Sequence, residues 1–399
     1  MRILLAVHRY HQHIVGGSEA AARVLAESLA NDGHQVDVVT SCSTDHRTWS
    51  NDLPPGVTGE NGVSIHRLQT IRNRTENNFY RINERVNVGL SSMVWEQQLW
   101  ARRLGPDLSG YGEWLDGMSS NFDVAVVMTY LYPTATVGLP LLSSRLPTVL
   151  FPTAHFEAAF RHLHSKSVIR QAHALAFLTP EERDLVYSLT KSDIPSAVVG
   201  LPVEGHVKAF TNTKRLHEKL NSQRYFVCVG RIDVGKGTFD LIEMFKSFKH
   251  RFPSDIKLVL VGEADTNDGD IISLGFCTEE EKREAISGAI ALIHPSFLES
   301  FSIVLCEAWL QERPVVVNGL CDVTSGQVSR SGGGLSYKSH DEFCAILHSL
   351  VTQPQIAKTL GKAGHSYVRA NYTWEVVSGH LYPLIAQAKK RFASSGGLD

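Results

Sequence analysis

Two carboxylates stand inside an otherwise apolar stretch of the sequence, HPSFLESFSIVLCEAW, at residues 294–309. The proline after the strand-like AIALI and the apolar spacing that follows predict a helix beginning near Phe301 or Ser302. Glu299 is then expected on a loop, and Glu307 within about two turns of the helix start. A helix carboxylate can accept hydrogen bonds from a pair of sugar hydroxyls such as those of ribose, while a loop carboxylate would lie nearer to phosphates. An exposed position on an amphipathic helix is the alternative for Glu307, but its apolar neighbours disfavour it, because they indicate burial and a buried acid needs a partner.

Two cations follow another strand-like segment, in the loop GRIDVGKG. Arg231 and Lys236 lie just after the apolar run YFVCV. A helical pattern follows them, with Leu241, Phe245 and Phe248 on one face. Cations at the carboxyl end of a strand in an open α/β sheet face the region where ligands bind, and a diphosphate needs its charges neutralised there. A solvated basic loop is the alternative. The loop is not a P-loop, since G-x-x-x-x-G-K-[ST] is absent.

A glycine pair follows the first strand-like run, RILLAV. Gly16 and Gly17 precede a helical segment that Ser18 can cap and Gly33 can end. Backbone without Cβ atoms at this position can approach a phosphate, and the helix N-terminus supplies partial positive charge. The spacing G-x-G-x-x-G is missing, and the next strand, QVDVVTS, is not followed by an acid. The pattern therefore disfavours a nicotinamide-dependent dehydrogenase.

These motifs are set in two successive alternations of strands and helices. The first begins with RILLAV, and the second begins with YFVCV and continues through KLVLVG, AIALI and RPVVV. In the second alternation Thr278 and Glu281 form an expected capping box. The pattern predicts two Rossmann-like halves, joined by a polar linker at residues 204–224. Between residues 71 and 120 the alternation is replaced by a helical insertion, and an acceptor pocket or a membrane-surface patch is the functional alternative for this segment.

Composition excludes several classes of protein. The chain has 399 residues, 43% of them hydrophobic and 20% charged, with a formal net charge of −2, which is typical of a globular protein with about two domains. Nucleic-acid binding is not expected without a basic excess. Six single cysteines without C-x-x-C give no zinc or disulfide pattern. The first residues do not have the form of a signal peptide, so a cytoplasmic location is expected.

The combined motifs resemble the large group of retaining GT-B glycosyltransferases related to glycogen and sucrose synthases, the E-x7-E type of glycosyltransferase family 4. The resemblance rests on the glycine pair, on GRIDVGKG and on the E-x7-E stretch followed by RPVV, and it extends to TPEERDLV and NYTWEVV. It implies an α/β fold of two Rossmann-like doubly wound domains that face a central crevice. The acceptor-side domain would span residues 1–203 and the nucleotide-sugar-binding domain residues 204–375, with residues 376–399 packing back on the first domain.

The resemblance also implies roles for the matching residues of the second domain. Arg231 and Lys236 would bind the diphosphate of the donor. Glu307 would bind the ribose hydroxyls, and Glu299 the transferred sugar near its anomeric carbon. The backbone N–H groups that would hold a phosphate are those of Phe301, Ser302 and Ile303.

Residues of the first domain match the same pattern. Gly16 and Gly17 would let this domain close over the donor phosphate. His155, in FPTAHFEAAF, matches a family histidine beside the sugar, where it would contact a hydroxyl or orient the reacting centre; judged alone, it would be a structural histidine. Two departures stand out in the second domain. The family usually has E-G-F-G where this chain has ESFS at residues 299–302, and often a glycine where Glu312 stands, so the added Cβ atoms can change the backbone angles.

The expected function is transfer of a hexosyl unit, with retention, from a nucleoside diphosphate sugar to a saccharide, lipid-linked or small-molecule acceptor. A uridine nucleotide is favoured on family grounds, and polysaccharide or glycoconjugate synthesis is the expected setting. No metal or other cofactor is expected, because no D-x-D motif is present and the leaving group can be stabilised by Arg231, Lys236 and a helix dipole. A sugar-nucleotide epimerase on the same fold and a non-catalytic sugar-nucleotide-binding subunit stay open as alternatives. Weak peripheral contact with the inner face of a membrane is left open, and the sequence does not indicate an oligomeric state.

Overall fold

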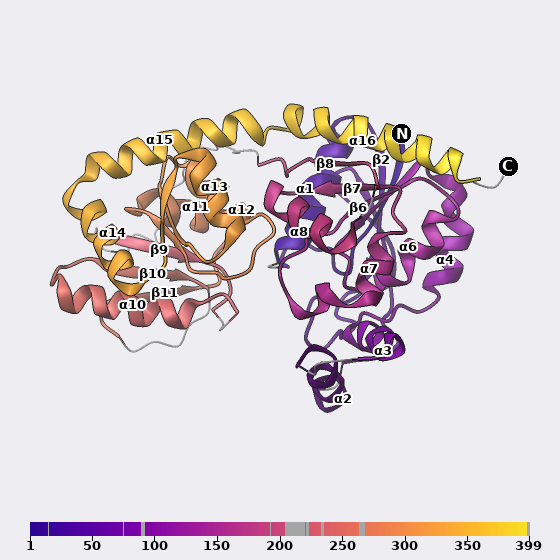
Figure 1. Ribbon diagram of the computed structural model, residues 1–399, viewed down its shortest axis with the longest axis horizontal. Helices are drawn as coiled ribbons and strands as arrows, with labels where there is room; N and C mark the ends of the chain where they lie inside the picture. Colours follow the sequence, from indigo (N-terminus) through magenta and orange to yellow (C-terminus); the bar gives the residue numbers. More distant parts are fainter. Residues whose placement is uncertain are drawn as a thin grey trace. The chain divides into compact units, whose positions relative to one another are not determined.

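A computed structural model describes residues 1–14, 16–74, 76–88, 92–191, 193–203, 220, 223–232, 235–262 and 268–396. The chain divides into two compact units (Figure 1). Unit 1 consists of residues 1–202 and 374–399, and unit 2 of residues 203–373. The polar stretch 204–224, expected to be a linker, lies mostly outside the described residues.

The described part of unit 1 is built on an eight-stranded sheet in the order β3-β4-β2-β1-β5-β6-β7-β8. All neighbouring strands are parallel except the edge pair β3 and β4. The strands are β1 (Arg2–Ala6), β2 (Gln35–Ser41), β3 (Gly56–Glu60), β4 (Val63–Leu68), β5 (Val124–Met128), β6 (Thr148–Phe151), β7 (Ala174–Phe177) and β8 (Ser196–Val198). Strands β5, β6 and β7 are buried along their whole length, which explains their continuous apolar sequences, since a parallel strand covered by helices on both faces has no solvent side.

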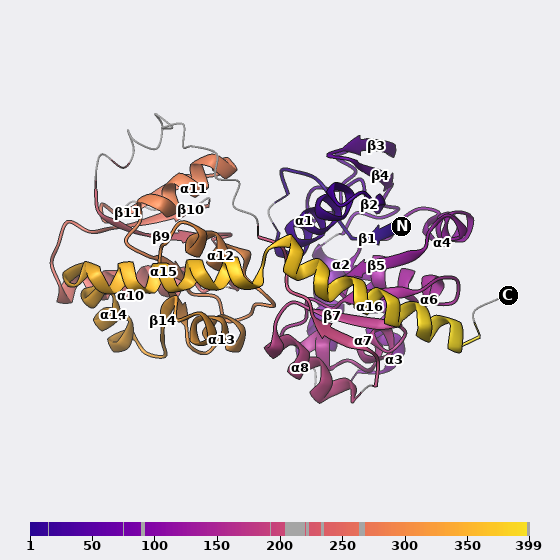
Figure 2. The same ribbon diagram turned by 90° about the horizontal axis from the view of Figure 1, so that it is seen from above.

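Helices cover this sheet and extend beyond it. They are α1 (Gly17–Asn31), α2 (Glu76–Asn83), α3 (Val94–Leu104), α4 (Tyr111–Met118), α5 (Pro133–Thr136), α6 (Gly138–Ser143), α7 (Leu163–Ile169), α8 (Pro180–Thr190) and α16 (Trp374–Ser394), with a π-helical turn at Glu84–Val88 and 3-10 turns at Ser119–Asn121 and Ala158–Arg161. The last helix, α16, packs on β6, β7 and β8 (Figure 2). Helices α2 and α3 pack against each other around Phe79, Ile82 and Trp100, a small apolar cluster separate from the main core (Figure 1).

Unit 2 is built on a parallel sheet whose described strands run in the order β11-β10-β9-β12-β13-β14. The strands are β9 (Tyr225–Val229), β10 (Lys257–Val261), β11 (Ile271–Gly275), β12 (Leu292–His294), β13 (Val315–Asn318) and β14 (Gly334–Tyr337). The helices whose bounds lie within the described residues are α10 (Thr238–Arg251), α11 (Glu279–Gly288), α12 (Ile303–Leu310), α13 (Asp322–Ser331), α14 (His340–Thr352) and α15 (Pro354–Asn371).

Local sequence signals account for several of these elements. The expected apolar face of α10 is buried at Leu241, Phe245 and Phe248. The capping box at the start of α11 is confirmed, because the Thr278 hydroxyl accepts from the N–H of Glu281 and the Glu281 carboxylate accepts from the N–H of Thr278. Among the described helices, none is both long and apolar enough to cross a membrane.

Candidate functional site

The strand order of unit 2 defines where a ligand would bind to it. Strands β10 and β11 lie on one side of β9, whereas β12, β13 and β14 lie on the other, so the order of the chain reverses between β9 and β12. In open α/β sheets ligands bind outside the carboxyl ends of the strands at this switch point. The loop after β9 carries Arg231 and Lys236, and the loop after β12 carries Glu299. The fold therefore directs the residues selected from the sequence to one edge of the sheet.

Four side chains at this edge form what we call the Glu299 cluster: Lys236, His294, Glu299 and Ser302. The ammonium of Lys236 donates to Glu299 Oε1 at 2.5 Å, and His294 Nε2 lies 3.1 Å from the same oxygen. Ser302 Oγ lies 3.3 Å from His294 Nε2. Only 12% of the Glu299 side chain is exposed. A carboxylate and a lysine selected for separate roles are thus in direct contact.

The electrostatics of the cluster keep Glu299 ionised. Burial alone would raise the pKa of Glu299, but the hydrogen bond and charge of His294, and then those of Lys236, hold the pKa well below its usual range. The cluster therefore holds a largely buried negative charge beside a positive charge that is 30% exposed.

The loop between β12 and α12 is shaped by a serine in a conformation that glycine favours. Ser302, the N-cap of α12, has φ 66° and ψ 79°, in the left-handed region. Glu312, the second departure from the family pattern, has φ 52°. Both residues therefore adopt backbone angles that suit the glycine usually found there, despite their Cβ atoms, at a cost of the order of 1 kcal/mol each. At Ser302 the side chain adds a contact with His294 that glycine could not make.

The start of α12 lies where the sequence analysis expected it. The helix begins at Ile303, so Glu299 is on the loop and Glu307 is on the helix, as predicted. The carbonyl of Phe301 accepts a hydrogen bond from the Gln327 side chain, which anchors the turn to α13. The N–H groups of Phe301, Ser302 and Ile303 lie in the turn that opens the helix; that they hold a phosphate stays a prediction.

A close approach of two loops explains one glycine of GRIDVGKG. Gly237, the N-cap of α10, has φ 69°, and a Cβ atom there would lie 2.7 Å from the carbonyl oxygen of Pro295. Since that contact is shorter than real Cβ atoms make, a side chain at this position would push apart the loops that carry Lys236 and Glu299. Arg231, in the same loop, has an exposed side chain. Its role at a diphosphate stays a prediction.

Glu307 has a partner that sequence reasoning missed. Lys282 Nζ, on α11, donates to Glu307 Oε1 at 2.7 Å and lies 2.8 Å from Glu279 Oε2. Burial lowers the pKa of Lys282, but the carboxylates of Glu307 and Glu279 outweigh burial and raise it. The side chain of Glu307 is 20% exposed, so an exposed helix position is excluded. The partner that its burial required is this lysine.

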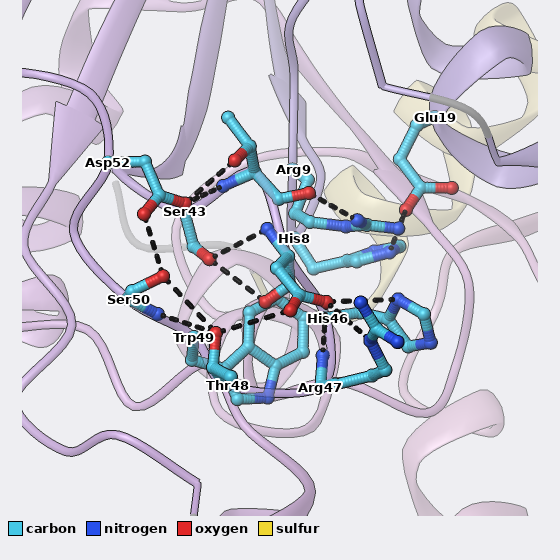
Figure 3. Close-up of polar contacts among 12 residues, drawn as sticks. His8, Arg9, Glu19, Ser43, His46, Arg47, Thr48, Trp49, Ser50 and Asp52 are labelled. Carbon is cyan, nitrogen blue, oxygen red and sulfur yellow. Dashed lines mark hydrogen bonds and ion pairs between the residues drawn. The ribbon is translucent and has the colours of Figure 1, made fainter. Parts of the chain in front are cut away.

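In unit 1 the order of the strands reverses between β1 and β5. His8 and Arg9 follow β1, and the glycine pair leads into α1. Figure 3 shows the side chains of His8 and Arg9 beside that of Glu19, which lies in the first turn of α1. We call His8, Arg9, Ser18 and Glu19 the Glu19 cluster. His8 Nε2 lies 2.9 Å from Glu19 Oε1, Arg9 donates to the same oxygen, and Ser18 Oγ donates to Oε2 at 2.8 Å.

The Glu19 cluster explains why a glycine stands at position 16. The backbone of Gly16 is extended, with φ −168°, so its torsion angle does not require glycine. A Cβ atom at Gly16, however, would lie 2.3 Å from Glu19 Oε2. The predicted cap at Ser18 was wrong: Gly16 is the N-cap, and the Ser18 hydroxyl is used by Glu19. Gly33 follows the end of α1 with φ 83°, as predicted for the residue that ends the helix.

Arg9 also connects the Glu19 cluster to the loop after β2. Its guanidinium donates to the carbonyl oxygen of Thr44 at 2.7 Å. Asp52 accepts from both the N–H and the hydroxyl of Thr44, at 2.9 and 2.7 Å, and from Ser50 Oγ at 2.7 Å (Figure 3). The cluster thus fixes the glycine turn and this loop together.

Replacing Glu19 with glutamine is expected to lower the free energy of unfolding by about 3–5 kcal/mol near pH 7, because it leaves Arg9 buried without its ionic partner. Burial alone would raise the pKa of Glu19, but His8, Arg9 and Ser18 hold it well below its ordinary value of 4.5. A depressed pKa gives stability that is present above about pH 4.5 and lost as the pH falls, so the difference between variant and parent should shrink in acid. Denaturant titrations across pH measure both effects.

Glu27→Gln is the matched control on the same helix. Glu27 accepts a hydrogen bond from exposed Asn61 at 3.0 Å, so its loss should cost well under 1 kcal/mol. Equal effects of the two substitutions would contradict a special role for the buried cluster.

His155 lies on the loop after β6, which we call the His155 loop and define as residues 152–157. About a third of its side chain, 31%, is exposed, and its Nδ1 lies 3.4 Å from Glu157 Oε1. The Tyr130 hydroxyl donates to the same Glu157 oxygen at 2.8 Å. Thr153 has φ 49°, a left-handed conformation that is costly for a β-branched residue and is often found at functional sites. The role of His155 at a sugar stays a prediction.

Several residues of these clusters were missed by sequence reasoning. His8 and Arg9 directly follow an apolar strand, and Glu19 lies in the first turn after a glycine pair, a pattern that could have indicated a polar cluster at the switch point. His294 was part of the stretch first singled out but was given no role. Lys282 had no usable signal, because its distance of 25 residues from Glu307 reflects only the packing of α11 on α12.

Comparison with known proteins shows which families and structures the chain resembles. Residues 210–366 match the family described as glycosyl transferases group 1. An uncharacterized glycosyltransferase of Methanocaldococcus jannaschii is 24% identical over 375 residues, covering 82% of this chain and 84% of that protein. Sucrose-phosphate synthase from Thermosynechococcus elongatus has a similar structure, with a TM-score of 0.71 at 17% identity, over 99% of this chain and 100% of that one. The Anabaena protein HepE in complex with UDP and glucose gives a TM-score of 0.70 at 13% identity, over 97% and 99% of the two chains.

The fold is therefore GT-B, and the chain is a glycosyltransferase. The recognition made from the sequence motifs is confirmed as a resemblance: residues 210–366 match the group 1 glycosyl transferases, and the fold is shared with a sucrose-phosphate synthase.

Proposed function

We propose that the protein transfers a hexosyl unit from a UDP-sugar to a saccharide, lipid-linked or small-molecule acceptor, with retention at the anomeric carbon. The observation that carries this proposal is the Glu299 cluster at the switch point of unit 2, where Lys236 and Glu299 are in contact beside the start of α12. A nucleoside diphosphate sugar is complementary to this cluster, because its anionic diphosphate can bind the lysine and the hydroxyls of its sugar can bind the carboxylate.

The diphosphate would be neutralised by cations and by oriented backbone dipoles. Lys236 and Arg231 would bind its oxygens, and the N–H groups of Phe301, Ser302 and Ile303 would donate hydrogen bonds to a phosphate at the positive end of the α12 dipole. Charge that develops on the leaving phosphate would be stabilised most, which lowers the barrier to breaking the glycosidic bond.

The sugars of the donor would be held by the two glutamates. Glu299, freed from Lys236, would accept hydrogen bonds from the transferred hexose near its anomeric carbon. Glu307 would accept from the ribose hydroxyls and exchange part of its interaction with Lys282 for them. The low pKa of Glu299 supports an acceptor role for its carboxylate and disfavours a role as proton donor.

For unit 1 the proposal assigns His155 to a hydroxyl of the transferred sugar and Gly16 and Gly17 to the donor phosphate. The wider division of labour follows the domains expected from the sequence. Residues 1–203 would serve the acceptor, residues 204–375 the nucleotide sugar, and residues 376–399 would support the first domain.

Retention would follow a same-face route. The bond between the anomeric carbon and the diphosphate oxygen breaks, a bond to the acceptor oxygen forms on the same face, and the acceptor proton passes to the leaving phosphate oxygen. The complex of HepE with UDP and glucose supports a uridine donor. Synthesis of a polysaccharide or glycoconjugate in the cytoplasm, with weak peripheral contact to the membrane, is the setting that we propose.

A thermal-shift panel with UDP, GDP, ADP and dTDP tests the proposal. At a hundred times its dissociation constant, UDP should stabilise the protein by about 2.7 kcal/mol, and the other nucleotides by less. Lys236→Ala and Glu307→Ala should each reduce the UDP shift. Lys257→Ala is the matched control, because Lys257 pairs with Asp270 at 2.8 Å on β10 and has no proposed role. If a different nucleotide alone raised the melting temperature, the donor would carry that base in place of uracil. If no nucleotide raised it, the proposal would be overturned.

A further inference from the structure

A fully buried carboxylate joins two loops at the carboxyl edge of the sheet in unit 1. Glu182, on α8, has no exposed surface. Its Oε2 accepts from the N–H of Leu178, at the end of β7, at 2.7 Å, while its Oε1 accepts from the N–H of Ala154, in the His155 loop, at 2.7 Å. The N–H of Thr153 also contributes to this carboxylate. One side chain thus bonds the loops that follow two adjacent parallel strands, β6 and β7.

The bond to Leu178 has a local explanation, but the bonds to the His155 loop do not. The sequence Thr179-Pro-Glu-Glu182 is a helix start in which the Thr179 hydroxyl accepts from the N–H of Glu182 at 3.2 Å. A helix start of this kind needs only one carboxylate oxygen. The second oxygen reaches 28 residues back along the chain, to Ala154.

The same local motif occurs elsewhere without this reach. At the start of α14 the Ser339 hydroxyl accepts from the N–H of Glu342 at 3.2 Å, and Glu342 Oε2 accepts from the N–H of Lys338 at 2.6 Å. Glu342 is exposed. Both glutamates thus bond to the start of their own helix. Of the two, Glu182 also bonds to a second loop.

The second loop is held in a costly conformation next to a predicted functional residue. Thr153 is left-handed, with φ 49°, and successive N–H groups in and after such a residue can form a concave site for an anion. Glu182 Oε1 occupies this position from within the protein. Its hydrogen bond to the loop offsets the strain at Thr153 and fixes the backbone that leads to His155.

We propose that Glu182 is a positioning residue for glycosyl transfer, which acts by holding the His155 loop in the conformation that presents His155 to the donor sugar. This inference rests on the proposed role of His155. The imidazole itself lies beside a different carboxylate, since its Nδ1 is 3.4 Å from Glu157 Oε1, which the Tyr130 hydroxyl also contacts.

The first experiment measures the loop without reference to activity. Burial raises the pKa of Glu182 to about 8, against the N–H groups of Leu178, Ala154 and Thr153, so the comparison is made at pH 9, where the carboxylate is charged. Glu182→Gln should speed hydrogen–deuterium exchange of the Thr153 and Ala154 amides, because glutamine offers one acceptor oxygen where the carboxylate offers two, and the N–H of Leu178 competes for it. Glu342→Gln should leave these amides unchanged. Unchanged exchange in a folded Glu182→Gln variant would overturn the inference.

The second experiment measures hydrolysis of UDP-glucose, in which water replaces the acceptor. Glu182→Gln should lower kcat by about 10- to 100-fold with KM nearly unchanged, because a small misplacement of a reacting group can cost up to about a hundredfold. In a His155→Ala background the same substitution should change kcat by less than about twofold, because its effect passes through His155. If Glu182→Gln lowered kcat by the same factor with and without His155, its effect would not pass through His155. Glu182 would then have only a structural role.

The outcomes also separate this inference from the proposed function. If His155→Ala and Lys236→Ala both retained full turnover, the site assignment would fail whatever Glu182 does. If these two lost turnover and Glu182→Gln did not, only the positioning role would fail. Should Glu182→Gln not fold, Glu182→Asp takes its place with the same expectations, since the shorter side chain keeps the charge but cannot reach both loops at once.

Discussion

Replacing Lys236 with alanine is expected to lower kcat for hydrolysis of UDP-glucose by about a hundredfold to a thousandfold. Loss of one preorganised charge at a developing anion typically has this effect. A second loss accompanies it. Glu299 is 12% exposed and shares its Oε1 between Lys236 and His294, so removing the lysine leaves a largely buried carboxylate with one partner fewer. The variant should therefore be less stable as well as less active.

Two further variants separate these losses. The double variant Lys236→Ala/Glu299→Gln should recover much of the stability, because no unpaired charge remains, but none of the turnover. Lys257→Ala, which removes another partly buried lysine from an ion pair with a carboxylate, that of Asp270, should retain full turnover. A Lys236→Ala protein with unimpaired turnover would remove Lys236 from the mechanism and with it the observation on which the proposed function rests.

Replacing His155 with alanine should lower kcat by about a hundredfold while the KM for UDP-glucose changes much less. The reason is that a hydroxyl contact at the transferred sugar is expected to strengthen as the glycosidic bond breaks, whereas most of the donor affinity would come from the nucleotide and diphosphate. Steady-state hydrolysis of UDP-glucose gives both constants. His164→Ala is a matched control, since His164 lies nearby in α7, is half-buried and has no proposed role.

A third variant tests the surroundings of His155. Glu157→Gln keeps the hydrogen bond from Tyr130 but removes the charge 3.4 Å from His155 Nδ1. Its kcat should fall less than that of His155→Ala. If His155→Ala retained the parent kcat, His155 would return to the structural role that a lone histidine on an apolar run first suggests.

The sequence indicated the scaffold and the residues at its edges because both leave local patterns. Continuous apolar segments predicted the parallel strands, and the capping box at Thr278 and Glu281 marked the start of α11 through groups only three residues apart. The loop position of Glu299 and the helix position of Glu307 followed from the proline after β12 and from helical spacing.

What the sequence did not indicate depends on contacts between distant segments. Lys282 meets Glu307 only because α11 packs on α12, and Ala154 meets Glu182 only because β6 pairs with β7. Backbone conformation was missed for a related reason. Ser302 and Glu312 adopt left-handed angles that serine and glutamate rarely choose, so their own preferences point away from the observed turns. At Ser18 the local rule failed because Glu19 competes for the hydroxyl that would have capped the helix.

The return of the chain to unit 1 bears on the order in which the protein can fold during synthesis. The chain leaves unit 1 after Pro202 and re-enters it at Trp374, and α16 packs on β6, β7 and β8. A ribosome therefore completes every strand of the first sheet long before it makes the helix that covers three of them. Until then the apolar side chains beneath α16 are open to water and to other nascent chains, whereas unit 2, which is continuous in sequence, has all its segments before α16 is made. A helix that is translated only after unit 2 thus covers the first sheet and ends its exposure to aggregation.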